Sequence, residues 1–358
     1  MAGNDEKAVR IGIIGAGRVG VDWQLPDIRK AGGDVVALAD AVAGRAARFA
    51  GKLGVPHAFD DYRDLLAMAE VEAVSICTPP AAHRDAAVAA FQAGKHVYLE
   101  KPPAMNEAEM REITAAARAA GTRFLVGSNG VYSNEIQILK RFMDGGELGD
   151  VYLVERISTS RRRLPMGWLR KKEIAGGGIG FDSTSHTLDH VLYLLGAPEP
   201  LSVTGRTYRH FAAHPSRMSY AHMDVEEGRW REVPVMETED TLAAMIQFRG
   251  GCTVLLKDCY AANMPEGGLF RIYGTRAGAT LHPLALYGET EDGVVTDTKP
   301  VVPPDPQGGH VQAFRHFFEC IRRGTDTESP GERSVITMRI LDAIYASAAD
   351  GGRQVRFE

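Results

Sequence analysis

A glycine-rich segment near the start of the chain has the spacing of a phosphate-binding turn. Residues 15–20 read Gly-Ala-Gly-Arg-Val-Gly and follow a short apolar run at 9–14. In such a turn the first glycine permits a tight bend, the second lets the backbone approach a pyrophosphate, and the third allows close helix–strand packing. Free N–H groups at the start of the following helix favour phosphate oxygens. The predicted cofactor contacts here are Gly15, Ala16, Gly17, Arg18 and Val19.

An acidic residue follows at the sequence spacing that is typical of a dinucleotide-binding fold. Asp40 ends the second apolar run, twenty residues after Gly20. A carboxylate there accepts hydrogen bonds from the adenosine ribose and repels a 2′-phosphate. Arg45 and Arg48, on the next predicted helix, could instead bind that phosphate, although solvated surface charge is their commoner role. We therefore expect NAD, with NADP as the alternative; a plain strand–turn–helix corner is the interpretation without a cofactor.

Two further strands are predicted to end in polar segments. Strand 73–77 runs into Thr78-Pro79-Pro80, and strand 97–99 into Glu100-Lys101-Pro102-Pro103. Ligands of open α/β sheets bind outside the carboxyl ends of the strands. Proline after a strand could be no more than a stop signal. A charged Glu-Lys pair at that edge indicates a site, because it would face the cofactor crevice.

A second glycine cluster, at 176–180, precedes a helix that carries acids and histidines. This helix is expected to begin near Asp182 or Ser183. Asp182, His186, Asp189 and His190 have i, i+4, i+7 and i+8 spacing, so they are predicted to share one helix face. The unperturbed pKa of imidazole, about 6.5, suits a base at neutral pH. A capping aspartate and a buried structural histidine are the alternative.

Together these segments resemble the Gfo/Idh/MocA family of sugar and cyclitol oxidoreductases over essentially the whole chain. The resemblance implies that Lys101, Asp182 and His186 are catalytic, and that the open sheet of the C-terminal domain forms a homodimer or homotetramer. Two departures stand out: Thr184 occupies a position where members commonly have glycine, and the segment 128–132 lacks the Arg-plus-aromatic element of many members. Further cofactor contacts implied by the resemblance are Thr78, Pro79, His83, Glu100 and Lys101.

The implied reaction is hydride transfer between a nicotinamide and a secondary alcohol or ketone of a sugar, sugar acid or cyclitol. His186 is the expected base, and Lys101 would stabilise charge on the substrate oxygen. A lyase or glycosidase that oxidises the ring transiently, or a non-catalytic NAD sensor, are the alternatives. The basic segment 156–172 could bind a substrate anion or merely form a solvated loop or an oligomer contact. The predicted substrate contacts are Lys101, Arg163, Trp168, Asp182 and His186.

Around these residues the chain alternates strands and helices up to residue 128 and is strand-rich afterwards. The predicted fold is α/β: a doubly wound parallel Rossmann sheet at 1–128, followed at 129–358 by an α+β domain for substrate and oligomerisation. Its sheet is predicted to be mostly antiparallel and open. Strands are expected at 201–209, 241–248, 252–259, 269–274 and 279–287, and loops at 210–240 and 288–308. Whether the final helices pack back on the first domain is left open.

Composition excludes several classes of protein. The 358 residues include 41 Lys and Arg against 46 Asp and Glu, a formal net charge of −5, whereas nucleic-acid binders are usually basic. No apolar stretch approaches the roughly 18 residues of a membrane-spanning helix. A polar N-terminus and four cysteines without a CxxC pair favour a cytoplasmic protein. No metal is expected, because His210, His214 and His222 lack ligand spacing.

Overall fold

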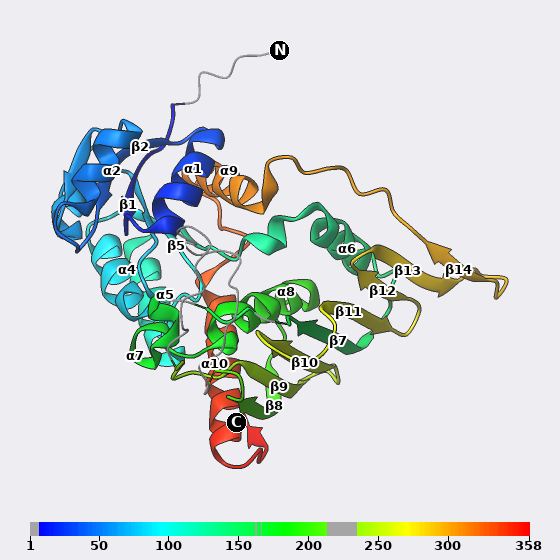
Figure 1. The fold of residues 1–358 in the computed structure, drawn as a ribbon. Coiled ribbons are helices and arrows are strands. Elements are labelled where there is room, and N and C mark those ends of the chain that lie inside the picture. The colour runs from blue at the N-terminus through cyan, green and yellow to red at the C-terminus, as the bar shows by residue number, and fades with distance from the viewer. Residues whose placement is uncertain (1–6, 162, 166, 213–234) are drawn as a thin grey trace. The chain divides into compact units, whose positions relative to one another are not determined.

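The computed structural model describes residues 7–161, 163–165, 167–212 and 235–358, which divide into two compact units (Figure 1). The first unit runs to Ala104 and continues with Ala108–Tyr132 and Asp305–Val335. The second contains Met105–Glu107, Ser133–Pro304 and Ile336–Glu358. The units therefore divide the chain differently from the predicted single boundary after residue 128, because residues 305–335 belong to the first unit.

The first unit has the predicted doubly wound parallel sheet. In the part of the chain that the structure describes, six strands pair in the order β3-β2-β1-β4-β5-β6, all parallel. Its apolar runs are buried as expected for a sheet covered on both faces. The prediction missed β3, which has only three residues, one exposed and two half-buried, and forms no long apolar run. The strands are β1 (Arg10–Ile14), β2 (Asp34–Ala39), β3 (His57–Phe59), β4 (Ala73–Ile76), β5 (His96–Leu99) and β6 (Phe124–Val126).

Local sequence signals, such as glycine, mark the ends of helices in the first unit. Helix α2, for example, is bounded by Gly44 and Gly54, both in the left-handed region at φ +71° and +66°. Near the end of the chain, α9 packs on the sheet by stacking Phe314 on Tyr98, with 4.2 Å between ring centroids. These helices are α1 (Leu25–Lys30), α2 (Arg45–Leu53), α3 (Tyr62–Leu66), α4 (His83–Gln92), α9 (Gly308–Arg323) and, apart from its first residue, α5 (Glu107–Ala120).

The second unit is built on one large sheet. Nine described strands pair in the order β14-β13-β12-β11-β7-β10-β9-β8-β15, and only β7 and β10 among them pair in parallel. The strands are β7 (Val151–Thr159), β8 (Pro200–Tyr208), β9 (Thr241–Phe248), β10 (Thr253–Cys259), β11 (Gly267–Gly274), β12 (Gly278–Leu281), β13 (Leu284–Glu289), β14 (Val295–Thr298) and β15 (Val355–Arg356).

Two predictions for this sheet were wrong in detail. The segment 279–287, predicted as one strand, forms the hairpin of β12 and β13 around His282 and Pro283. Proline has no N–H to offer a strand ladder, so the chain turns there. The predicted loop at 288–308 contains β14, a short and mostly exposed edge strand without an apolar run.

One face of this sheet is buried and the other is open. Alternate side chains such as Leu242, Ile246 and Val254 are fully buried, and Ile344 of α10 lies against Gly205 of β8. Met245 and Leu255, on the opposite face, are 38% and 37% exposed. The helices of this unit are α6 (Asn134–Asp144), α7 (Lys172–Ala175), α8 (Ser185–Leu195) and most of α10 (Gly331–Ala349).

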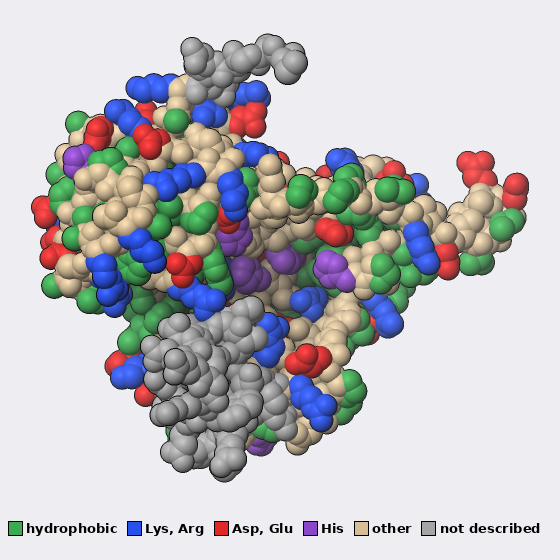
Figure 2. Space-filling model, turned by 45° about the horizontal axis from the view of Figure 1, so that its top comes forward, with side chains coloured by type: hydrophobic (Ala, Val, Ile, Leu, Met, Phe, Trp, Pro, Cys, Tyr) green, Lys and Arg blue, Asp and Glu red, His purple; other side chains and the backbone are tan. Residues whose placement is uncertain are grey.

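The surface of the molecule carries both signs of charge. On the face drawn in Figure 2, basic and acidic side chains are interspersed. Within the described ranges, no helix is both long enough and apolar enough to cross a membrane.

Candidate active site

The three glycines of the first turn have three different environments. Gly15 adopts φ +102°, which favours glycine, and a Cβ on Gly20 would lie only 2.1 Å from the Gly15 carbonyl oxygen. A Cβ on Gly17 would meet no atom of the described chain within 4 Å. The turn therefore leaves open space where a pyrophosphate approaches the backbone, so the residues present fit a dinucleotide.

Asp40 at the end of β2 holds the same turn. Its Oδ2 accepts the Ala16 N–H at 2.8 Å, and its Oδ1 accepts the Val42 N–H at 2.8 Å. The Arg45 guanidinium lies 3.4 Å from the Asp40 carboxylate, whereas Arg48 lies over the Phe49 ring. Asp40 thus links the second strand end to the glycine turn, and Arg45 neutralises part of its charge.

A π-helical turn, Val19–Gln24, follows the glycines. Such wide turns are frequent at functional sites. Arg18, predicted as a cofactor contact, is exposed, with its guanidinium 5.6 Å from the Trp23 ring centroid. Val19 is half-buried at the start of this turn. The stacking on Trp23 keeps the Arg18 charge beside the phosphate-binding turn.

The ends of β4 and the glycine turn meet. A Cβ on Gly15 would lie 3.0 Å from the Thr78 backbone nitrogen. The Thr78 hydroxyl is buried and has no hydrogen-bond partner among the residues that the structure describes. A buried polar atom without a partner costs free energy, so this hydroxyl fits a polar atom of a bound ligand. Pro79, half-buried, leads into the short turn before α4.

His83, a cofactor contact implied by the resemblance, lies between two segments that follow strands. Its ring is fully buried, with Nε2 2.7 Å from the Thr78 carbonyl oxygen and Nδ1 2.9 Å from the Pro102 carbonyl oxygen. Burial lowers the pKa of His83 to about 4, against the opposing effect of these carbonyls. The side chain therefore joins the two segments that follow β4 and β5.

Glu100 and Lys101 follow β5 directly. The Glu100 carboxylate is buried and accepts hydrogen bonds from the Gln24 amide and, at 3.2 Å, from the Lys101 N–H. Burial raises the pKa of Glu100, although His310 and Lys101 favour its charged form. Lys101 itself is half-buried. The structure thus places Lys101 at the ligand-binding edge of the sheet, next to a buried acid.

In the second unit, a buried acid holds the second glycine cluster. Glu239 Oε1 accepts the N–H groups of Gly178 and Gly180 at 2.9 and 3.0 Å, and the Tyr345 hydroxyl at 2.6 Å. A Cβ on Gly177 would lie 2.2 Å from that hydroxyl, and one on Gly178 would lie 2.0 Å from the Glu239 carbonyl oxygen. Burial raises the pKa of Glu239, and these hydrogen bonds oppose the shift. The cluster is glycine because larger residues would collide with its supports.

The helix predicted to begin near Asp182 begins with a different geometry. Gly180–Thr184 forms a π-helical turn, and the α-helical part, α8, starts only at Ser185. Asp182 therefore lies in the π-helical turn, and His186, Asp189 and His190 lie within α8. There His186 lies beside His190, with 6.2 Å between ring centroids.

Residues from β10 support this turn. Tyr260, just after the strand, donates its hydroxyl to Asp182 Oδ2 at 2.7 Å. Asp258, inside the strand, accepts the Thr184 hydroxyl at 2.7 Å. Thr184, which departs from the glycine that family members commonly have, is therefore accommodated by a buried hydrogen bond. Sequence analysis missed Tyr260, Asp258, Glu239 and Tyr345, since nothing in their spacing connects them with residues 176–186.

The predicted substrate contacts of the basic segment lie in the same unit. Trp168, in the short turn Gly167–Arg170, is 39% exposed. Arg163 is exposed, and its N–H donates to the Tyr260 carbonyl oxygen at 2.8 Å. The backbone of Arg163 thus contacts Tyr260, whose hydroxyl in turn contacts Asp182. Three other predictions fall on residues outside the described ranges, namely Arg162, His214 and His222.

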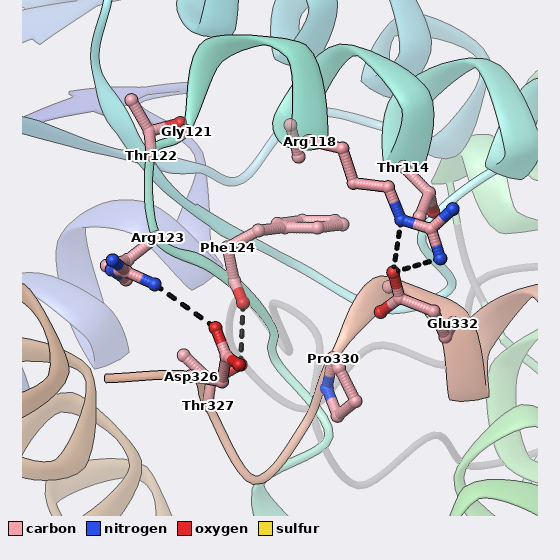
Figure 3. Close-up of a pocket in the computed structure, with 12 residues that line it drawn as sticks. Thr114, Arg118, Gly121, Thr122, Arg123, Phe124, Asp326, Thr327, Pro330 and Glu332 are labelled. Atoms are coloured by element: carbon pink, nitrogen blue, oxygen red, sulfur yellow. Dashed lines mark hydrogen bonds and ion pairs between the residues drawn. The ribbon is translucent and has the colours of Figure 1, made fainter. Parts of the chain in front are cut away.

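A separate cavity of about 580 Å³ lies in the first unit (Figure 3). It is lined by the end of α5, the start of β6 and the segment 326–332, so it lies where β6 begins and not at the carboxyl ends of the strands. Arg118 pairs with Glu332 at 2.7 Å, and Arg123 with Asp326 at 3.1 Å. Each guanidinium in the cavity thus already has a carboxylate partner. In the described part of the chain, no group of three His, Cys, Asp or Glu residues could hold a metal ion.

Comparison with known proteins identifies the family. Residues 9–128 match the family model "Oxidoreductase family, NAD-binding Rossmann fold", and residues 140–357 match "Oxidoreductase family, C-terminal alpha/beta domain". The D-glucoside 3-dehydrogenase of Escherichia coli is 28% identical, covering 96% of this chain and 97% of that protein. The inositol 2-dehydrogenase of Rhizobium meliloti is 24% identical, again covering 96% of this chain and 97% of that protein.

Solved structures share the fold. An oxidoreductase domain protein from Kribbella flavida has a TM-score of 0.85 and 22% identity, with 98% of this chain and 100% of that chain covered. A levoglucosan dehydrogenase, solved with NADH and levoglucosan, has a TM-score of 0.82 and 20% identity, with 98% and 99% covered. With both of its units matched, the chain belongs to the Gfo/Idh/MocA family of NAD-binding oxidoreductases.

Proposed function

We propose that the chain is an NAD-dependent dehydrogenase or reductase that acts on a secondary alcohol or ketone of a sugar, sugar acid or cyclitol. One observation carries the proposal: Lys101 lies beside a buried acid at the ligand-binding edge of a dinucleotide-type sheet. The full-length relatives named for D-glucoside and inositol dehydrogenation support the substrate class.

The roles of the residues follow from their chemistry. When bound, the nicotinamide supplies the carbon that accepts or returns a hydride. The Lys101 ammonium stabilises negative charge on the substrate oxygen. His186 takes the hydroxyl proton, a contribution of about 10²–10⁴-fold in rate. Asp182, fixed by Tyr260, orients the imidazole and stabilises its cation. Arg163, whose N–H donates to the Tyr260 carbonyl oxygen, and Trp168, five positions further along the chain, are the proposed substrate contacts of the basic segment.

NAD is the proposed cofactor, with NADP as the alternative. Asp40 at the end of β2 presents a carboxylate where the adenosine ribose binds in this kind of fold, which disfavours a 2′-phosphate. The ion pair between Arg45 and Asp40 supports this choice, because it engages the cation that NADP would need. The glycine turn, Thr78 and Pro79 are the other proposed contacts.

The experiment is a screen of sugars, sugar acids and cyclitols with NAD and with NADP, following reduced cofactor and carbon products together. Net NADH with a keto product supports the proposal. Eliminated or hydrolysed product without net NADH would instead identify a lyase or glycosidase, and tight NAD binding without turnover would identify a sensor.

Variants test the assigned residues. Lys101→Met and His186→Asn should each lower kcat by at least about 100-fold. Their matched controls are Lys52→Met on the exposed end of α2 and His210→Asn in the second unit, both exposed. Full turnover by Lys101→Met or His186→Asn would exclude that residue from the chemistry.

We also propose a cytoplasmic homodimer or homotetramer. All four cysteines are free thiols, which suits a reducing compartment. The open face of the large sheet carries the exposed apolar side chains Met245 and Leu255 on neighbouring strands, which suits self-association.

A further inference from the structure

Gln24 is a buried polar residue that the proposed mechanism does not use. It ends the π-helical turn after the glycines and is 0% exposed. Its amide oxygen accepts hydrogen bonds from the Ser75 hydroxyl and, at 2.9 Å, from the Cys77 thiol. Its amide nitrogen donates to Glu100 Oε1. One side chain therefore links the glycine turn to the ends of β4 and β5.

The partners fix which way the amide points. Ser75 and Cys77 can donate to an oxygen, whereas the Glu100 carboxylate can only accept when it is charged. The amide oxygen must therefore face β4, and the nitrogen must face β5. An aliphatic side chain at position 24 would leave these buried groups unpaired, which is unfavourable.

The second oxygen of the same carboxylate continues the chain of hydrogen bonds. Glu100 Oε2 accepts the backbone N–H of Lys101 at 3.2 Å. A Cβ on Gly127 would lie 3.3 Å from Glu100 Oε1 and 2.9 Å from the Tyr98 ring, so the carboxylate is also closely bounded on the β6 side. Contacts on both sides thus determine where Glu100 lies, and Glu100 in turn holds the backbone of Lys101.

We propose that Gln24 is a positioning residue for the reaction, which orients Glu100 and thereby holds Lys101 at the substrate oxygen. The proposal rests on the function proposed above for Lys101. Because Gln24 is fully buried, it acts only through Glu100 and not by contact with a ligand. The glycine turn, which receives the phosphates, and Lys101, which acts on the substrate, are in this way connected by a single buried amide.

The first test is Gln24→Met, which keeps the length of the side chain and removes its hydrogen bonds. Misplacing a catalytic group by about 1 Å can cost about 100-fold, so we expect kcat to fall about 10- to 100-fold. The Kd for NAD, measured by calorimetry, should change less than about threefold. The control is Thr114→Val, which removes the buried hydrogen bond from Thr114 to the Met110 carbonyl on α5. A Gln24→Met variant with kcat within twofold of the parent would overturn the proposal.

The second test, Gln24→Glu, separates positioning from packing. At low pH the introduced carboxyl and Glu100 share one proton, and this O–H···O hydrogen bond replaces the one that the Gln24 amide donates. At high pH both groups are carboxylates, and they repel each other. Activity should therefore be recovered at low pH and lost as pH rises, relative to the parent. The other titratable groups facing Glu100 are Cys77, Tyr98, Lys101 and His310, and all are unchanged in this variant. A profile parallel to that of Gln24→Met at every pH contradicts the proposal.

The third test needs no substrate, so it separates a failure of this proposal from a failure of the proposed function. Amide hydrogen exchange at residue 101 should be at least about tenfold faster in Gln24→Met than in the parent, because the Glu100 carboxylate no longer holds the Lys101 N–H. Exchange within α2, in the same unit, is the internal reference and should be unchanged. Equal protection of residue 101 in parent and variant would exclude the positioning role, whether or not a sugar substrate has been found.

Discussion

At the scale of single residues, the acids of this protein are held by partners distant in sequence. Tyr260 reaches Asp182 across 78 positions, and Tyr345 reaches Glu239 across 106. Local patterns could predict Asp182, because it follows a glycine cluster and precedes a histidine. Nothing local marks Tyr260 or Tyr345, since only the packing of β10 and α10 brings them to these acids. Sequence therefore predicted candidate reactive groups and missed the residues that hold them.

Tyr260→Phe tests the importance of such a partner. A hydrogen bond to a charged group is worth about 1.5–3 kcal/mol, so we expect kcat to fall about 10-fold or more while the Kd for NAD stays constant. The matched control is Tyr273→Phe, which removes a hydroxyl that donates to Glu155 at 2.5 Å in the same sheet. Steady-state kinetics gives kcat, and binding measurements give the Kd for NAD, for both variants. Equal kcat for the two variants would mean that the Tyr260 hydroxyl has no part in turnover.

At the scale of elements, the predictions were most successful where the hydrophobic or glycine pattern of a segment matches the geometry of the element that it forms. The long apolar strands and the glycine turn after β1 lie where their patterns place them. The π-helical turns Val19–Gln24 and Gly180–Thr184 could not be predicted, because an extra residue in a helical turn has no periodic signature. The edge strands β3 and β14 also lack a sequence signature: they bury too little side-chain surface to require a run of apolar residues.

The glycine turn gives a prediction at this scale, because two of its glycines have opposite environments. Gly17→Ala should leave the thermal midpoint of the protein without cofactor within about 2 °C and weaken NAD binding at least about tenfold, since the new methyl occupies only the open space. Gly20→Ala places a Cβ 2.1 Å from the Gly15 carbonyl oxygen and should lower the midpoint itself. Differential scanning calorimetry with and without NAD distinguishes the two. Equal destabilisation by both substitutions would refute the assigned roles.

At the scale of the whole molecule, His83 should make stability depend on pH. Burial lowers its pKa from 6.5 to about 4, so its folded pKa lies below its unfolded value. The stability that it contributes is present above about pH 6.5 and is lost as pH falls through 4, a loss of about 3 kcal/mol. We expect the difference in unfolding free energy between the parent and His83→Gln to shrink by about this amount from pH 7 to below pH 4. Urea unfolding at several pH values measures it; a constant difference would contradict the shift.

The proposed homodimer or homotetramer would associate through the open face of the large sheet. Thr204, Met245, Leu255, Glu155 and Arg271 form a row across five neighbouring strands, each the register partner of the next. A two-fold axis through this row would bring Met245 and Leu255 of one subunit near the same residues of its partner, and would bury the apolar surface of both subunits at once. Lysine at both positions would then place like charges face to face.

The double variant Met245→Lys/Leu255→Lys should therefore be a monomer under conditions where the parent is a dimer or tetramer. Light scattering after size exclusion measures the mass, and circular dichroism checks that the variant is folded. The control, Val301→Lys, changes a side chain that is 92% exposed and lies outside this row, so its mass should match the parent. A monomeric parent, or a folded double variant with the parent's mass, would show that this face does not hold subunits together. Loss of mass together with unchanged NAD binding would place the association surface on the large sheet and leave the dinucleotide unit independent of it.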